Sequence, residues 1–211
     1  MKTVLCYGDS LTWGYNAEGG RHVFDDRWPS VLQAGLGNGV KVIAEGLNGR
    51  TTAFDDHTAG ADRNGARMLP TILTTHAPID LIVIMLGAND MKPWIHGNAV
   101  AAKYGVKRLI DIVRGHDYPF DWAAPLILIV SPPLLSRTDN ADFKAMFAGG
   151  DDASKQLAPQ YAALADETGC GFFDAGSVAL TTPLDGVHLD AENTRNIGKA
   201  LTPVVRVMLE L

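Results

Sequence analysis

The chain alternates short apolar runs with longer stretches in which apolar residues recur every three or four positions. Several of the short runs are rich in Val, Ile and Leu without polar alternation, which is typical of parallel strands buried on both faces. The predicted strands are Thr3–Tyr7, Val40–Glu45, Asp80–Leu86, Leu126–Val130 and Gly171–Asp174.

The stretches between these runs carry helical patterns. The predicted helices are Pro29–Leu36, Arg67–His76, Ala99–Arg114, Ser154–Glu167 and Ala191–Leu209. Alternating strands and helices imply a parallel sheet with helices on both faces. No repeat, low-complexity segment or linker divides the chain, so we expect a single domain over residues 1–211. The long connection Pro132–Gly150 predicts a loop over a site, and its role as a lid or a subunit contact stays open.

The composition of the chain indicates a globular protein and argues against nucleic-acid binding and membrane insertion. With 211 residues, 46% hydrophobic and 20% charged, the chain can build a substantial core. Its net charge of −6 and the lack of a basic cluster argue against nucleic acid or an anionic membrane as partner. The longest apolar run, Leu81–Leu86, is too short to span a bilayer. Two cysteines, Cys6 and Cys170, and no signal-peptide pattern predict buried free thiols and a cytoplasmic protein.

Ser10 is the first candidate for chemistry. It follows a predicted strand through Gly8-Asp9, where glycine allows a sharp turn, and stands where a helix begins. A serine there can attack a carbonyl, and its own N–H can help to hold the resulting oxyanion. The alternative is that Asp9 or Ser10 only caps the helix.

Two further strand ends carry candidate donors. Asn89, in Gly87-Ala88-Asn89-Asp90, offers a side-chain amide toward developing negative charge, although an Asn-Asp turn explains it equally. Gly49 follows the second predicted strand and has no side chain to block its N–H, but alone it indicates no more than a turn. Ligands of open parallel sheets bind beyond these carboxyl ends.

Asp185 and His188, three residues apart after the last predicted strand, can bend toward each other. Asp185 would accept a hydrogen bond from Nδ1 of His188, and Nε2 would face a serine as general base. A surface loop with an exposed histidine is the alternative. No zinc-spaced Cys or His pair, phosphate-binding glycine loop or GxSxG elbow occurs, so no metal site is predicted.

These segments together resemble the SGNH (GDSL) hydrolase family. The first family block is similar to Gly8-Asp9-Ser10-Leu11, the second contains Gly49, and the third is similar to Gly87-Ala88-Asn89-Asp90. The fifth block is similar to Asp185-Gly186-Val187-His188, and all four occur in the family's order. The phrases GDSLTWG, EGLNGRTT and IMLGANDMK are closest to the bacterial arylesterase and acyltransferase branch.

The resemblance implies a flavodoxin-like three-layer αβα sandwich with a five-stranded parallel sheet. It implies a serine esterase that needs no cofactor, with a triad of Ser10, His188 and Asp185. Its oxyanion hole would be the N–H groups of Ser10 and Gly49 and the Asn89 side chain. The substrate would be a short-chain acyl or aryl ester, with possible transfer to alcohols or peroxide, and the chain would form a homo-oligomer. Leu189 stands where many members have proline, which bears on the rigidity of that loop.

The sequence also suggests residues that contact the substrate, and it leaves two alternative functions open. Trp13 and Trp94 lie near the motifs and are predicted to line an apolar, narrow cleft. A carbohydrate acetyl esterase on the same triad would instead require polar residues around the cleft. A non-catalytic flavodoxin-like binding module would need a flavin loop, which is not evident, or an acidic pocket such as Asp9 and Asp55 could form.

Overall fold

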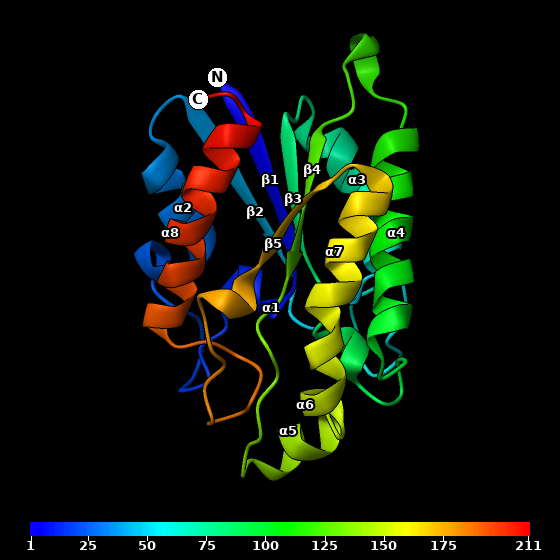
Figure 1. Cartoon of the computed structure of the whole chain (residues 1–211), viewed down its shortest axis with the longest axis vertical. Coiled ribbons are helices and arrows are strands. Elements are labelled where there is room, and N and C mark those ends of the chain that lie inside the picture. The colour runs from blue at the N-terminus through cyan, green and yellow to red at the C-terminus, as the bar shows by residue number, and fades with distance from the viewer.

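A computed structural model describes all residues 1–211 and contains one five-stranded, all-parallel sheet (Figure 1). The sheet order is β2-β1-β3-β4-β5. The strands are β1 (Lys2–Gly8), β2 (Val40–Gly46), β3 (Leu81–Met85), β4 (Leu126–Ser131) and β5 (Gly171–Asp174). Each predicted strand agrees with these bounds within one residue at either end. The fold class predicted from the sequence is therefore confirmed.

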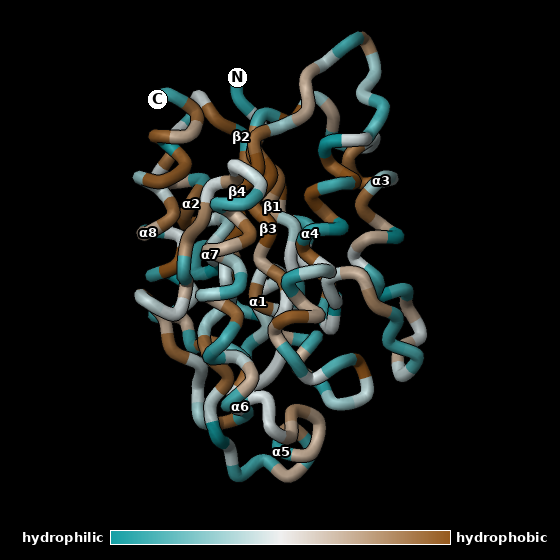
Figure 2. The backbone as a smooth tube through the Cα atoms, turned by 45° about the vertical axis from the view of Figure 1, so that its right-hand side comes forward, coloured by the Kyte–Doolittle hydropathy of each residue, from teal (hydrophilic) through white to brown (hydrophobic).

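Helices cover both faces of the sheet. The longer ones are α2 (Trp28–Leu36), α3 (Gly65–His76), α4 (Ala99–Gly115), α7 (Leu157–Thr168) and α8 (Ala191–Met208). Figure 1 shows α2 and α8 on one side of the sheet and α3, α4 and α7 on the other. Figure 2 shows hydrophobic strands at the centre, surrounded by helices of mixed hydropathy. No helix is both long and apolar enough to cross a membrane.

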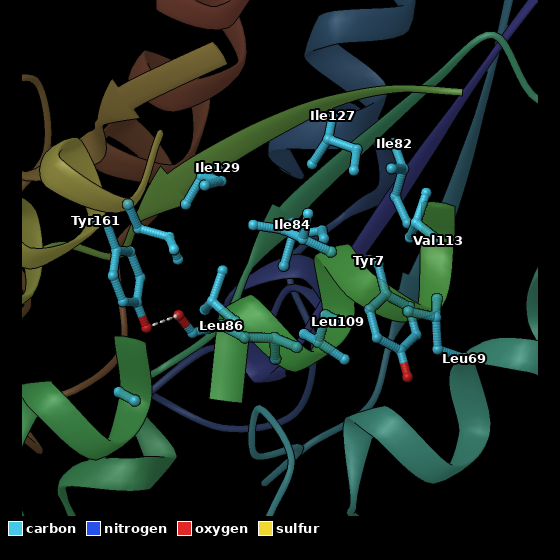
Figure 3. Close-up of a cluster of buried hydrophobic side chains, with 14 of the residues drawn as sticks. Tyr7, Leu69, Ile82, Ile84, Leu86, Leu109, Val113, Ile127, Ile129 and Tyr161 are labelled. Atoms are coloured by element: carbon cyan, nitrogen blue, oxygen red, sulfur yellow. Dashed lines mark hydrogen bonds between the residues drawn. The ribbon is translucent and has the colours of Figure 1, made fainter. Parts of the chain in front are cut away.

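The two layers of helices enclose separate cores because successive strand residues point to opposite faces. Leu5 and Tyr7 of β1 belong to the core beneath α3, α4 and α7, whereas Val4 and Cys6 belong to the core beneath α2 and α8. Each fully buried large side chain contributes about 1.5–3 kcal/mol. Figure 3 shows the first core, with the Tyr161 hydroxyl donating to the carbonyl of Leu86 at 3.0 Å.

The strand register sets the position of the site. Gly8, the last residue of β1, is paired with Gly46 of β2 and with Met85 of β3. The carboxyl ends of the three strands therefore reach one level. The chain passes from β1 to β2 on one side and later to β3 on the other. Such a reversal of strand order opens a crevice at the carboxyl ends.

Some predicted elements differ in detail. The connection Pro132–Gly150 is not wholly a loop, because it contains α5 (Ala141–Met146), and α6 (Gly150–Ala153) begins at its end. Asn140 caps α5 by accepting from the N–H groups of Asp142 and Phe143, a local signal that the apolar periodicity does not carry. The helix predicted from Ser154 begins with a 3₁₀ turn, Ser154–Gln156, before α7.

The cysteines also depart partly from the expectation. Both are free, but only Cys6 is buried, while Cys170 is partly exposed at the start of the edge strand β5. Edge strands have one neighbour, so β5 is only half-buried along its length.

Candidate active site

Ser10 lies at the carboxyl end of β1, as the first residue of the short helix α1 (Ser10–Trp13). Asp9 caps this helix, and its Oδ1 accepts from the Leu11 N–H at 2.9 Å. Gly8 is required here because a Cβ at this position would collide with the Thr12 hydroxyl and would lie 2.9 Å from the Met85 carbonyl. Asp9 therefore caps α1, and Ser10, as the first residue of the same helix, is free to take part in chemistry.

The loop after β5 brings a histidine to this serine. Nε2 of His188 lies 2.9 Å from Oγ of Ser10, and Nδ1 lies 2.6 Å from Oδ2 of Asp185. The second carboxylate oxygen, Oδ1, accepts from the N–H groups of Val187 and His188, each at 2.9 Å. Ser10, Asp185 and His188 are all buried. The arrangement can pass the serine proton to the imidazole and hold the resulting positive charge beside a carboxylate.

Asp185 is ionised in this setting. Burial alone would raise its pKa, but the hydrogen bond and charge of His188 and the two backbone donors hold that pKa below its ordinary value.

Two rings enclose the imidazole of His188. Tyr15 stacks on it with ring centroids 4.0 Å apart, and Phe143 of α5 meets it edge-on at 5.8 Å. Neither ring was predicted to be a site residue, because no spacing rule relates it to a histidine that is distant in the chain. For Tyr15, the one feature of the sequence that indicates a place in the site is that it lies close to the Gly8-Asp9-Ser10 motif.

Hydrogen bonds hold the loop that carries His188, in which Leu189 follows the histidine. The carbonyl of Leu189 lies 2.9 Å from Nε2 of the buried His22, and the Thr182 N–H donates to the His188 carbonyl at 2.7 Å. These hydrogen bonds restrain the backbone on both sides of the imidazole.

Asn89 and Gly49 lie beyond the ends of β3 and β2. Asn89 is buried in the 3₁₀ turn η2 (Asn89–Met91), and its Nδ2 donates to Asp9 Oδ2 at 3.3 Å and to the Arg50 carbonyl at 3.2 Å. Gly49 has φ of +81°, a conformation that side chains disfavour. Both hydrogen bonds of the amide are long, which leaves it able to turn toward a stronger acceptor.

Arg50 is a structural residue. Its guanidinium is buried and donates to the backbone carbonyls of Gly8, at 2.8 Å, and Glu45. It also lies 4.2 Å above the Tyr7 ring centroid. Arg50 thus links the carboxyl ends of β1 and β2.

Two buried aspartates lie beneath the site. Burial raises the pKa of Asp9 to about 6, although Leu11, His188 and Arg50 oppose the rise. Burial likewise raises the pKa of Asp90 to about 6, against hydrogen bonds from Thr52. The Thr52 hydroxyl and N–H both donate to Asp90, which anchors the segment after Gly49 to η2.

Trp13 and Trp94 occupy different environments. The Trp13 ring faces Arg21, whose guanidinium carbon lies 4.5 Å from the ring centroid. Trp94 is half-exposed, and its Nε1 donates to the buried Asp56 at 3.4 Å. The acidic pocket considered from Asp9 and Asp55 does not form, because Asp55 is at the surface and pairs with Arg67.

A cavity of about 720 Å³ opens between the 132–150 connection and the 182–187 loop. Its wall includes Phe143, Phe147, Asp185 and Val187, so it reaches the carboxylate end of the Ser10–His188–Asp185 arrangement rather than Ser10. Polar residues line its other side, including Arg137 and Asp151, which form an ion pair at 3.1 Å. The connection thus forms one wall of a hollow beside the site.

The chain is similar to known esterases over its whole length. The sequence profile of the GDSL-like lipase/acylhydrolase family matches residues 6–194. A carbohydrate acetylesterase family member from Sinorhizobium meliloti is 68% identical, with a TM-score of 0.99 and full coverage of both chains. The aryl esterase of M. smegmatis is 40% identical, with a TM-score of 0.93 over 99% of this chain and 100% of that one.

A second carbohydrate acetylesterase from Sinorhizobium meliloti is 38% identical, with a TM-score of 0.94 over 99% of this chain and 100% of that one. No curated protein gives a significant sequence match. The family profile and the two kinds of esterase structure agree with one another and with the order of the four motifs. The chain therefore belongs to the GDSL-like lipase/acylhydrolase family of carboxylic ester hydrolases.

Proposed function

We propose that Ser10 is the nucleophile of this esterase, His188 its general base and Asp185 the carboxylate that orients the imidazole. The observation that carries the proposal is the continuous path from Ser10 Oγ to His188 Nε2 at 2.9 Å and from Nδ1 to Asp185 at 2.6 Å. Because Asp185 accepts the Nδ1 proton, Nε2 of the neutral ring is free to accept from the serine.

The oxyanion hole consists of the Ser10 N–H, the Gly49 N–H and the Asn89 amide. The Asn89 amide donates to Asp9 at a long 3.3 Å, so a developing oxyanion at about 2.7–3.1 Å is the better acceptor. This donor therefore strengthens its hydrogen bond as the tetrahedral intermediate forms, which is the condition for lowering the barrier.

The reaction proceeds in two steps. Ser10 attacks the ester carbonyl while His188 takes the hydroxyl proton, and His188 then returns that proton to the departing alcohol. Water, activated by the same imidazole, attacks the acyl-enzyme and releases the acid. An alcohol or peroxide in place of water would make the same site an acyltransferase. No step requires a cofactor.

Short-chain acyl esters, including aryl esters, fit the rings that surround His188. Carbohydrate acetyl esters are the second candidate, favoured by the polar group around Asp56 that lies beside Trp94. Relatives named for each substrate class occur among the similar structures. Comparing release of acetate from acetylated monosaccharides with hydrolysis of p-nitrophenyl acetate separates the two. Assembly as a homo-oligomer and a cytoplasmic location remain predictions.

A fluorophosphonate probe tests the nucleophile. Wild-type protein should gain the mass of one probe, and Ser10→Ala should gain none. Ser177→Ala is the matched control, since Ser177 is exposed and its hydroxyl donates only to the Asp174 carbonyl. Labelling of Ser10→Ala, or no labelling of folded wild type, would contradict the proposed triad.

A further inference from the structure

A group of charged side chains lies beside the proposed oxyanion hole, and ester hydrolysis as described above does not use it. This group, the Arg63 cluster, consists of Arg63, Lys92, Asp56 and Trp94. Nζ of Lys92 lies 3.3 Å, and Nη1 of Arg63 3.6 Å, from the same Asp56 oxygen, Oδ2. The Asp56 side chain is fully buried and that of Lys92 is 5% exposed.

The cluster borders the reaction centre on two sides. A Cβ at Gly49 would lie 2.7 Å from Cζ of Arg63, so the guanidinium packs directly on the backbone of the proposed oxyanion glycine. The Lys92 ammonium lies 5.7 Å from the Phe147 ring centroid. Phe147 stacks with Phe143 at 6.3 Å, and Phe143 meets the His188 ring. Arg63 therefore lies against the proposed oxyanion glycine, and Lys92 lies beside the aromatic pair that reaches the His188 ring.

Hydrogen-bond donors in the cluster outnumber acceptors. Asp56 Oδ1 already accepts from the Thr58 N–H at 3.1 Å, from its hydroxyl at 2.5 Å and from Trp94 at 3.4 Å. The Lys92 ammonium, which has three N–H groups, has one acceptor, at 3.3 Å. Arg63, with five N–H groups on a side chain 28% exposed, has only the 3.6 Å contact with Asp56.

The charges in the cluster do not balance. Burial alone would raise the pKa of Asp56, but donors from Thr58 and Lys92 lower it to about 2, so Asp56 is ionised. One carboxylate thus faces an ammonium and a guanidinium. The neighbouring carboxylates are already engaged. Asp9 accepts from Leu11 and Asn89. Asp55 and Asp62, which line the same hollow as Arg63, both pair with Arg67. A partly desolvated cation that lacks acceptors favours an anionic group, and a guanidinium matches a carboxylate in shape.

We propose that the Arg63 cluster binds a carboxylate of the substrate, so that the enzyme prefers short-chain esters that carry this group near the scissile bond. Arg63 makes the principal contact because its guanidinium is the more exposed cation. Lys92 adds positive charge from behind, and Trp94 shields the pair from water. The inference rests on the proposed triad and names the substrate class that it serves.

The test uses two matched pairs of esters. In the first, 4-acetoxybenzoate and its methyl ester differ by a charge on the alcohol portion. In the second, p-nitrophenyl hemisuccinate and its methyl ester differ by a charge on the acyl portion. The measured quantity is the ratio of kcat/KM for the charged ester to that for the neutral ester. Comparing this ratio between variants cancels the intrinsic reactivity of the esters.

In at least one pair, Arg63→Met should lower the ratio about tenfold or more, as expected for loss of a charge-assisted hydrogen bond. Arg63→Lys should keep part of it, and added salt should lower it in wild type. Arg108→Met, on the exposed face of α4 without a side-chain partner, should leave the ratio unchanged. The pair that responds identifies the portion of the substrate that carries the carboxylate.

Equal losses for charged and neutral esters in Arg63→Met would overturn the inference and assign Arg63 to support of Gly49. The inference would also be overturned if Arg63→Met left the kcat/KM ratio unchanged in both pairs. Faster turnover of neutral acetylated sugars than of either charged ester would overturn it as well. In each of these cases the proposed triad still holds if the fluorophosphonate probe labels the wild type. If the wild type neither reacts with the probe nor hydrolyses any ester, the proposed triad and the carboxylate-binding role of the Arg63 cluster are both contradicted.

Discussion

Replacing Asp185 by asparagine should disable the site by trapping the wrong tautomer of His188. The orientation of the new amide follows from the hydrogen bonds of Asp185. Its Oδ1 accepts from the N–H groups of Val187 and His188, and its Oδ2 accepts from Nδ1 of the imidazole. In Asp185→Asn the carbonyl oxygen must stay with the two backbone donors, so the NH₂ group faces Nδ1. Nδ1 then becomes an acceptor and the proton moves to Nε2.

The expected loss of kcat follows from the move of the His188 proton from Nδ1 to Nε2. Nε2, 2.9 Å from Ser10 Oγ, would carry a proton and could no longer accept one. The substitution also removes the charge that stabilises the imidazolium form. An equivalent asparagine in a serine protease triad lowers kcat about 10⁴-fold, or about 5.5 kcal/mol of transition-state stabilisation. We expect a loss of similar order here, while the loop stays folded because its backbone hydrogen bonds persist.

Steady-state hydrolysis of p-nitrophenyl acetate measures the loss, and thermal unfolding verifies that the fold is retained. Nitrogen chemical shifts of His188 report the tautomer directly. Asp117→Asn is the matched control, because Asp117 is exposed in the connection after α4 and has no side-chain hydrogen bond. A folded Asp185→Asn with more than about a tenth of wild-type kcat, or with the proton still on Nδ1, would refute the reasoning.

Three further predictions follow from the site. Asn89→Ala should lower kcat on the order of 10²-fold with little change in thermal stability, and full activity would contradict its place in the oxyanion hole. Tyr15→Ala, which removes the ring stacked at 4.0 Å on His188, should lower kcat several-fold, whereas Tyr15→Phe should retain it. Asp9 has its pKa raised from 3.8 to about 6, so native protein binds the extra proton and loses stability as pH rises through that interval. Asp9→Asn should therefore gain about 2 kcal/mol relative to wild type between pH 4 and 7 in urea unfolding, and a pH-independent difference would contradict the shift.

Much of the architecture is determined by local sequence. Runs such as Leu81–Leu86 are apolar without alternation because both faces of a central parallel strand are covered, and this makes strand positions readable. The positions of the motif residues can be predicted for the same reason, since each motif follows a predicted strand and lies at the carboxyl edge of the sheet. The sequence pattern did not predict the helix α5, because none of its six side chains is fully buried and the helix is too short to show an apolar periodicity.

Tertiary structure decided which of these residues meet. Ser10 and His188 are 178 positions apart, and only the parallel register of β1 with its neighbours, together with the loop held by Asp185, brings them to 2.9 Å. No spacing rule in the sequence predicts that Tyr15 stacks on His188, that the Arg63 guanidinium packs on Gly49 or that Arg50 binds backbone carbonyls. The pattern along a chain records which side of an element is buried, whereas contacts between distant loops arise from the packing of whole elements.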